Sequence, residues 1–144
     1  MLKMADSVKS IERRAVEALK AVLNEVPLIK LRGIESEFQD SDGRVDILAR
    51  VSVSGKRHTL ACEVKMDGQP RHVRIALLQL RSYMAHVAGD ATPVLIAPFL
   101  SSQAQALCRE QGVSFLDLEG NVRLVFESIF IERSVTNRPA VQPM

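Results

Sequence analysis

The stretch DGRVDILARVSVSGKRHTLACEVK, residues 42–65, decides the fold that we predict for this chain. Residues 44–53 alternate strongly between apolar and polar side chains, and residues 57–65 follow after a short turn at Ser54 and Gly55. Alternation with a period of two is typical of a strand with one buried face, and a short glycine-containing turn between two such segments indicates a hairpin. The stretch therefore predicts two antiparallel strands joined by a tight turn.

The charged side chains of this hairpin fall on defined faces of its strands. Because side chains alternate along a strand, Glu63 and Lys65 point the same way on the second strand. On the first strand Asp46 points away from the predicted apolar face. That apolar face consists of Val45, Ile47, Ala49, Val51 and Val53. The turn is about equally far from Asp46 and Glu63, so antiparallel pairing brings these two carboxylates together.

Two neighbouring carboxylates need a compensating charge, because like charges about 4 Å apart repel by roughly 4 kcal/mol at an effective dielectric near 20. A divalent cation between Asp46 and Glu63 would remove this repulsion. Hard oxygen ligands without His or Cys favour Mg²⁺ or Mn²⁺. Such an ion binds phosphate oxygens and lowers the pKa of a bound water, and the charge of Lys65 can orient that water or stabilise the transition state.

The three residues resemble the signature of the PD-(D/E)XK nuclease superfamily, also called restriction endonuclease-like. That signature is an Asp near a strand start followed by (Asp/Glu)-x-Lys on the next strand, which Asp46, Glu63 and Lys65 match. Val45 stands where the name of the motif refers to proline. The similarity covers roughly residues 6–98, in the order helix, three strands, helix, strand. It implies a restriction endonuclease-like core, Mg²⁺ dependence and hydrolysis of DNA phosphodiester bonds.

Members of this superfamily often carry a further acid on the first helix, and some place a glutamine on the helix after the lysine strand. Glu12 lies near the apolar stripe of the predicted first helix, whereas Glu17 points away from it. Glu12 is therefore either an auxiliary acid of the site or a helix-flank carboxylate paired with neighbouring arginines. Gln79 borders the apolar face of the later helix, where it is either a site residue or a surface glutamine.

The rest of the chain completes an α/β pattern. Apolar spacing predicts helices over residues 6–24, 71–89 and 101–112, and strands over residues 28–38, 92–99, 113–118 and 122–126. Asp6 is the expected cap of the first helix, and Gly33 indicates a bulge or bend in the first strand. Strands followed by alternating strands and helices predict a mixed β-sheet flanked by helices on both faces.

Composition limits the size and setting of the protein. With 144 residues and 47% hydrophobic content, residues 1–133 suit one domain. Residues 134–144, which include two prolines, form a tail or the start of a linker to a further C-terminal domain. The two cysteines, Cys62 and Cys108, are expected as buried free thiols. With no apolar segment long enough to span a membrane, we expect a cytoplasmic protein.

The net charge of +2 permits an anionic partner without requiring one, so a nucleic-acid partner must be inferred from the placement of basic residues. Basic residues that flank the predicted site in sequence could contact DNA phosphates and give salt-sensitive affinity. They are Lys56, Arg57, Arg71, His72 and Arg74. The alternative is an ordinary solvated basic surface.

These observations favour a metal-dependent DNA endonuclease. Asp46 and Glu63 would be the metal ligands, and Glu12, Lys65 and Gln79 would complete the catalytic set. The alternative is a non-catalytic DNA-binding or regulatory module on the same fold, within a longer protein. Many related nucleases pair two subunits to cut two strands, so the resemblance also implies a homodimer.

Overall fold

The computed structural model describes residues 3–41, 43–87 and 89–135, and for residues 3–7 the backbone alone. Its elements follow the order α1, β1, β2, β3, α2, β4, α3, β5, β6, β7. The helices are α1 (Lys3–Asn24), α2 (Pro70–Met84) and α3 (Ser102–Glu110). The strands are β1 (Ile29–Asp40), β2 (Gly43–Val53), β3 (Lys56–Val64), β4 (Ala91–Ala97), β5 (Ser114–Asp117), β6 (Val122–Phe126) and β7 (Ile129–Arg133).

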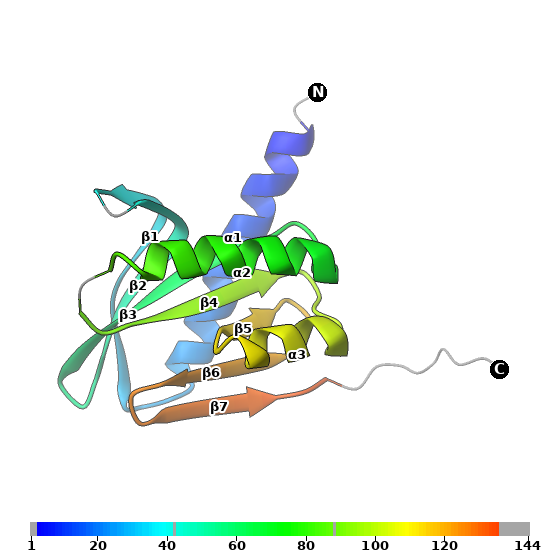
Figure 1. Cartoon of the computed structure of the whole chain (residues 1–144). Coiled ribbons are helices and arrows are strands. Elements are labelled where there is room, and N and C mark those ends of the chain that lie inside the picture. The colour runs from blue at the N-terminus through cyan, green and yellow to red at the C-terminus, as the bar shows by residue number, and fades with distance from the viewer. Residues whose placement is uncertain (1–2, 42, 88, 136–144) are drawn as a thin grey trace.

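The seven strands form one mixed sheet in which the spatial order equals the order along the chain (Figure 1). Strands β1 to β3 pair antiparallel as a meander. Strands β3, β4 and β5 pair parallel, because α2 and α3 carry the chain back between them. Strands β5 to β7 are again antiparallel.

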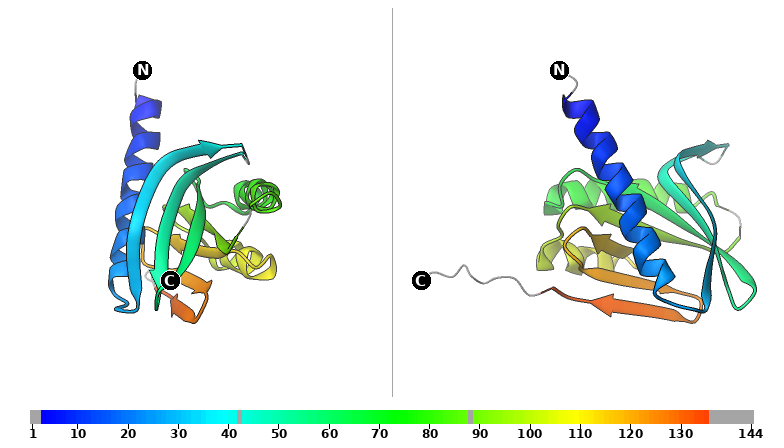
Figure 2. Two further views of the ribbon diagram at one scale, coloured as in Figure 1. Left: turned by 90° about the vertical axis from the view of Figure 1, so that its left-hand side faces the viewer. Right: turned by 180° about the vertical axis from the view of Figure 1, so that it is seen from behind.

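Helix α1 covers one face of the sheet, and α2 and α3 lie side by side on the other (Figure 2). Each face has its own apolar core. Ala15, Leu19 and Leu23 of α1 pack on the first face, and Val73, Leu80 and Ala104 of α2 and α3 pack on the second. The predicted fold class, a mixed sheet with helices on both faces, is therefore confirmed.

Local chemistry explains several element boundaries. The hydroxyl of Ser101 accepts a hydrogen bond of 3.1 Å from the Ala104 amide and so caps α3. Pro70 occupies the first turn of α2, where its missing N–H costs nothing. The pairing of β1 with β2 shifts between Leu31 and Gly33, which confirms the expected bulge.

Three local predictions were wrong. Helix α1 begins at Lys3, so Asp6 lies within it and does not precede it. Helix α2 ends at Met84, well before residue 89. Strand β7 was not predicted, because its hairpin turn uses Glu127 with a positive φ of 51° instead of the glycine that marks such turns.

Both cysteines are buried and free, as predicted. Of the predicted tail, residues 134–144, only Ser134 and Val135 fall within the described residues. In the ranges that the structure describes, no helix combines the length and apolar character needed to cross a membrane.

Candidate active site

The register of the β2–β3 hairpin places Asp46 beside the motif on β3. Ile47 pairs with Cys62, so Asp46 lies one residue before that pair and Glu63 one residue after it. The Val64 amide donates a hydrogen bond of 2.8 Å to Oδ2 of Asp46. The Asp46 side chain is only 9% exposed. Asp46 is thus fixed against the segment that carries both Glu63 and Lys65.

The alternation of side chains along β2 is interrupted at Asp46, where the β1–β2 pair bends. Phe38 pairs with Val45 and Ser36 pairs with Ile47, but the residue between them on β1, Glu37, has a positive φ of 54°. Val45 therefore packs in the cluster that contains Leu48 and Tyr83, and not with Ile47 on the α1 face. The prediction of one apolar face from Val45 to Val53 was wrong at Val45.

Glu63 and Lys65 share one face, as the alternation along β3 predicted. Nζ of Lys65 lies 3.8 Å from Oε2 of Glu63, with side chains 25% and 12% exposed. The backbone amide of Lys65 is tied to β4 by a 2.9 Å hydrogen bond to the carbonyl oxygen of Ile96. Burial and the neighbouring Asp46 carboxylate raise the pKa of Glu63 to about 7, although Lys65 opposes them.

Arg44 is a site residue that was not identified from the sequence. Its Nη1 atom lies 3.4 Å from Oδ1 of Asp46, and its side chain is about half exposed. Arg44 stands two positions before Asp46 on the same strand, so alternation alone could have placed both on one side. The guanidinium group supplies part of the positive charge that the carboxylates need.

Glu12 is brought into the same neighbourhood from α1. Its pKa is raised first by burial and then by the charges of Asp46 and Glu37, while Arg44 acts in the opposite direction. Glu12 and Glu37 also share a side-chain hydrogen bond. Glu37 was not identified from the sequence, because no local pattern signals the left-handed backbone that turns it toward α1.

Two surface hollows flank the Glu63–Lys65 pair. One, with a volume of about 280 Å³, is lined by Gly43, Arg44, Glu63, Gln79, Ser82 and Tyr83. The other, about 230 Å³, is lined by Lys65, Met66, Asp67, His72 and Ile75. The structure thus places Gln79 beside Glu63 and His72 beside Lys65. His72 is held there by a 2.6 Å hydrogen bond between its Nδ1 and Oδ1 of Asp67.

The remaining basic residues are spread over the molecule. Lys56 and Arg57 lie at the opposite end of β3, on the order of 25 Å from Val64 at about 3.3 Å per residue. Lys56 there forms ion pairs with Asp90 and Glu127. Arg71 lies at the exposed start of α2, whereas Arg74 lines a separate hollow between α2 and α3. Of the predicted DNA-contacting residues, His72 lines the hollow that contains Lys65, and Arg71 interacts electrostatically with Asp67 of that hollow.

The donor set fits a hard divalent cation in part. Among residues 3–41, 43–87 and 89–135, no group of three or more His, Cys, Asp or Glu side chains is placed to hold a metal ion. Asp46 and Glu63 offer two carboxylates, and Mg²⁺ is often held by one or two carboxylates together with water and phosphate oxygens. Burial raises the pKa of Glu63 most and repulsion from Asp46 adds to it, and a cation would relieve that repulsion.

No protein-family model and no curated protein sequence matches this chain. Solved structures do share its architecture. The FdxN element excision controlling factor protein from Anabaena variabilis has a TM-score of 0.51 at 14% identity, covering 73% of this chain and 89% of that chain.

Two nuclease structures are also similar. EndoMS in complex with double-stranded DNA has a TM-score of 0.48 at 22% identity, covering 75% of this chain and 45% of that chain. A repair endonuclease from Pyrococcus abyssi has a TM-score of 0.46 at 18% identity, covering 69% of this chain and 44% of that chain. The matched region thus spans less than half the length of either nuclease.

The strand order, the αβββαβ core and the hairpin that carries the motif define the class: the chain has the restriction endonuclease-like, PD-(D/E)XK fold. At these identities the similarity concerns the fold alone.

Proposed function

We propose that this chain is a metal-dependent DNA endonuclease domain that hydrolyses phosphodiester bonds. The observation that carries the proposal is the bond from the Val64 amide to Asp46, which holds one carboxylate against the strand segment that presents Glu63 and Lys65. Convergence of two acids and a lysine at a partly open surface is costly for stability alone, and it suits a site that binds a cation and an anionic substrate.

In this proposal Asp46 and Glu63 hold Mg²⁺ or Mn²⁺. When bound, the ion would lower the pKa of a water and neutralise charge on the scissile phosphate. Lys65, held near Glu63, orients the attacking water and stabilises negative charge that develops on the phosphoryl oxygens. Burial and the nearby acids raise the pKa of Glu12, so it is a stronger base than an ordinary carboxylate and is suited to hold a water molecule or to accept a proton from it.

The DNA backbone would pass over the two hollows on either side of Glu63 and Lys65. Arg44 and Gln79 line the first hollow and His72 lines the second, so each can contact a phosphate or sugar oxygen. Arg71, exposed at the start of α2, adds positive charge that acts on Asp67, a residue of the second hollow. Lys56 and Arg57 lie most of a strand length from this path, and Arg74 lines the separate hollow between α2 and α3.

The decisive experiment incubates supercoiled plasmid and a branched DNA with the protein in Mg²⁺, in Mn²⁺ and in chelator. We expect nicking that requires the metal ion and is lost in Glu63→Gln and Lys65→Ala. Matched controls are Glu17→Gln on the exposed flank of α1 and Lys30→Ala on β1, which should cleave like the wild type. Cleavage that persists in chelator, or that survives both site variants, would refute the proposed mechanism.

A second candidate is a non-catalytic DNA-binding or regulatory module on this fold. The observation in its favour is the 3.4 Å contact of Arg44 with Asp46, which neutralises a carboxylate without a metal ion. Under this alternative the wild-type protein binds DNA in a salt-dependent manner but never nicks it, with either metal ion present.

A further inference from the structure

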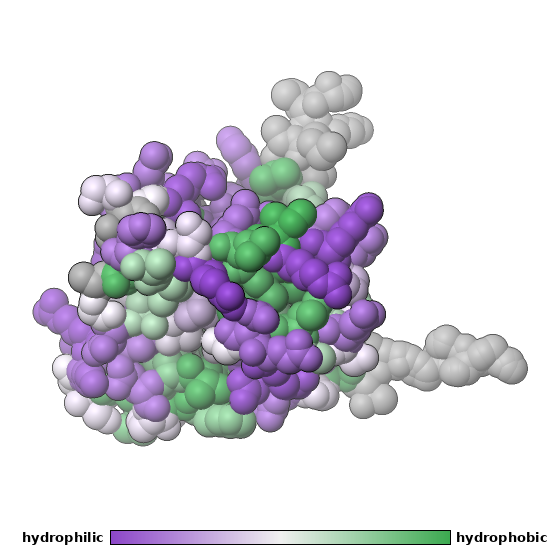
Figure 3. All heavy atoms as spheres, viewed as in Figure 1, coloured by the Kyte–Doolittle hydropathy of each residue, from purple (hydrophilic) through white to green (hydrophobic). Residues whose placement is uncertain are grey.

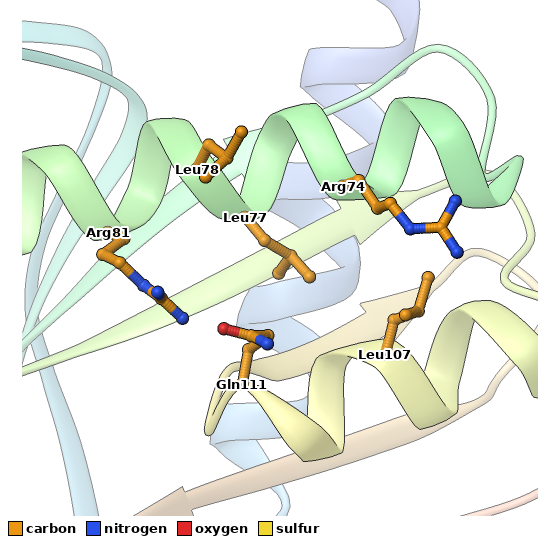
Figure 4. Close-up of a pocket in the computed structure, with 6 residues that line it drawn as sticks. All are labelled: Arg74, Leu77, Leu78, Arg81, Leu107 and Gln111. Atoms are coloured by element: carbon orange, nitrogen blue, oxygen red, sulfur yellow. The ribbon is translucent and has the colours of Figure 1, made fainter.

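A groove between α2 and α3 lies on the side of α2 away from Glu63. Its central hollow, about 280 Å³, is lined by Arg74, Leu77, Leu78, Arg81, Leu107 and Gln111. Figure 4 shows Leu77 of α2 and Leu107 of α3 reaching toward each other, with Arg74 and Arg81 at the two ends of the hollow. A further hollow, about 150 Å³, shares Leu77, Arg81 and Gln111 and extends the groove toward Met84.

The apolar residues on the outer side of α2 are not explained by the core. The inner face of α2 already packs on the sheet and on α3. Yet Leu78, which lines this groove, is 65% exposed, whereas the exposed Ile75 of the same helix lines the hollow beside Lys65. Figure 3 shows a green, apolar surface over α2 and toward α3, bordered by purple, polar residues. An apolar patch with a polar rim is typical of a binding surface.

The charge of the rim indicates what kind of partner fits. Neither Arg74 nor Arg81 forms an ion pair with a side chain in the described part of the chain. The two arginines are two helical turns apart, about 10 Å at roughly 1.5 Å per residue. A helix lying along the groove would therefore meet them with carboxylates about seven residues apart, and would place large apolar side chains on Leu77 and Leu107 between them.

We propose that the α2–α3 groove binds an amphipathic helix of another protein, with Asp or Glu residues two turns apart on either side of a large apolar residue. DNA fits the groove less well, because phosphates would cover the exposed Leu78 and the partly buried Leu107 without a favourable contact to either. A second copy of the chain also fits less well. Twofold pairing through the groove would bring Arg74 of one copy against Arg81 of the other, and like charges would repel.

The test selects a displayed library of helical peptides on the immobilised wild-type domain. The library is randomised at two flank positions seven residues apart and at the apolar positions between them. We expect enriched peptides to carry Asp or Glu at both flanks and Leu, Ile, Met or Phe between them. Enrichment without an acidic preference would overturn the proposal, and so would a failure to enrich any peptide over background.

The best enriched peptide is then labelled and titrated by fluorescence anisotropy. We expect the double variant Arg74→Glu/Arg81→Glu to weaken binding at least tenfold and Leu78→Asp to weaken it severalfold. Arg14→Glu, on the exposed flank of α1, serves as the matched control and should bind like the wild type. Glu63→Gln should also bind normally, so this result is independent of nuclease activity. Equal affinity for wild type and the double variant would overturn the proposal.

Two further measurements test whether DNA or a second copy of the chain occupies the α2–α3 groove instead. Displacement of the peptide by a short DNA duplex at moderate salt would assign the groove to nucleic acid and overturn the proposal. Concentration-dependent dimerisation in sedimentation experiments that is abolished by Leu78→Asp would assign the groove to a second copy, and would equally overturn it. We expect neither.

Discussion

Oδ2 of Asp46 accepts a hydrogen bond of 2.8 Å from the backbone amide of Val64, the residue between Glu63 and Lys65. This bond joins the start of β2 to the end of β3 and holds Asp46 against the segment that carries Glu63 and Lys65. It also consumes one acceptor site of Asp46, while Arg44 contacts the other oxygen. The stability of the protein and its affinity for metal ions should therefore depend on pH and on substitutions near Asp46 and Glu63.

The stability of the metal-free protein should fall as pH rises, because of Glu63. Its pKa is about 7 in the folded protein and near 4.5 when unfolded, so folding favours the protonated form. That contribution is fully present below about pH 4.5 and is lost as pH rises through about 7. We expect the free energy of unfolding of Glu63→Gln, relative to that of the wild type, to increase by roughly 2 kcal/mol from pH 5 to pH 8 in chelator. Urea unfolding at both pH values measures this gain, and a pH-independent difference would contradict it.

Divalent cations should stabilise the wild type more strongly at high pH. A metal ion competes with the proton on Glu63, so Mn²⁺ affinity should be about tenfold higher at pH 8 than at pH 6. At 100 times the dissociation constant the ion adds about 2.7 kcal/mol of stability. Thermal unfolding with and without Mn²⁺ measures this effect. Asp46→Asn should lose it and Glu17→Gln should keep it; an equal shift in both variants would place the ion elsewhere.

Removing Arg44 should affect metal and DNA in opposite directions. Arg44→Gln deletes the cation that contacts Asp46, so we expect Mn²⁺ to bind about fivefold more tightly, or about 1 kcal/mol. The same change should weaken DNA binding, because a phosphate contact is lost. Calorimetry and anisotropy measure the two effects. Arg50→Gln is the matched control, since Arg50 pairs with Glu35 at 3.1 Å on the same strand pair. If Arg44→Gln bound both Mn²⁺ and DNA more weakly, Arg44 would not compete with the metal ion for Asp46.

His58 should contribute stability without taking part in the site. Its Nε2 lies 2.7 Å from Oγ1 of Thr92 and its Nδ1 lies 2.9 Å from Oε2 of Glu127, so it links β3, β4 and the turn before β7. We expect His58→Ala to cost about 2–4 kcal/mol, with cleavage per folded molecule unchanged. Exposed His86→Ala should cost little. Urea unfolding combined with the plasmid assay would reveal a site role if activity fell more than the folded fraction.

Gly68 should be intolerant of a side chain. A Cβ atom there would overlap the carbonyl oxygen of Phe99, so the loop after Lys65 could not keep its place beside the loop after β4. We expect Gly68→Ala to cost about 3 kcal/mol and to reduce cleavage. Gly33→Ala is the control, because a Cβ atom at Gly33 would meet no other atom within 4 Å. Thermal unfolding of both variants tests the contrast, and similar melting temperatures would contradict it.

Local patterns in the sequence were sufficient for the hairpin and for the side on which Glu63 and Lys65 lie. The β2–β3 turn and the alternation along β3 depend on neighbouring residues only, so they could be predicted from residues 44–65. Strand β7 was missed because Glu127 adopts a backbone conformation that its side chain does not signal.

The residues that surround Asp46, Glu63 and Lys65 could be identified only from the tertiary structure. Glu37 itself has a left-handed backbone conformation on β1 and interacts with Glu12. At the same bend Val45 packs with Leu48 and Tyr83 instead of on the α1 face. Lys56 and Arg57 are near Glu63 in sequence but a full strand length away in space, whereas His72 lies beside Lys65. Sequence separation along an extended strand is therefore a poor guide to proximity.

The sequence by itself determined that an acid on β2 would meet a Glu-x-Lys segment on β3, because strand period and turn length are local properties of the chain. Only the tertiary structure decided which charges surround that meeting point and that α2 and α3 together form an exposed apolar groove. Those features depend on how distant elements pack and on how the sheet bends, and short-range patterns carry no information about either.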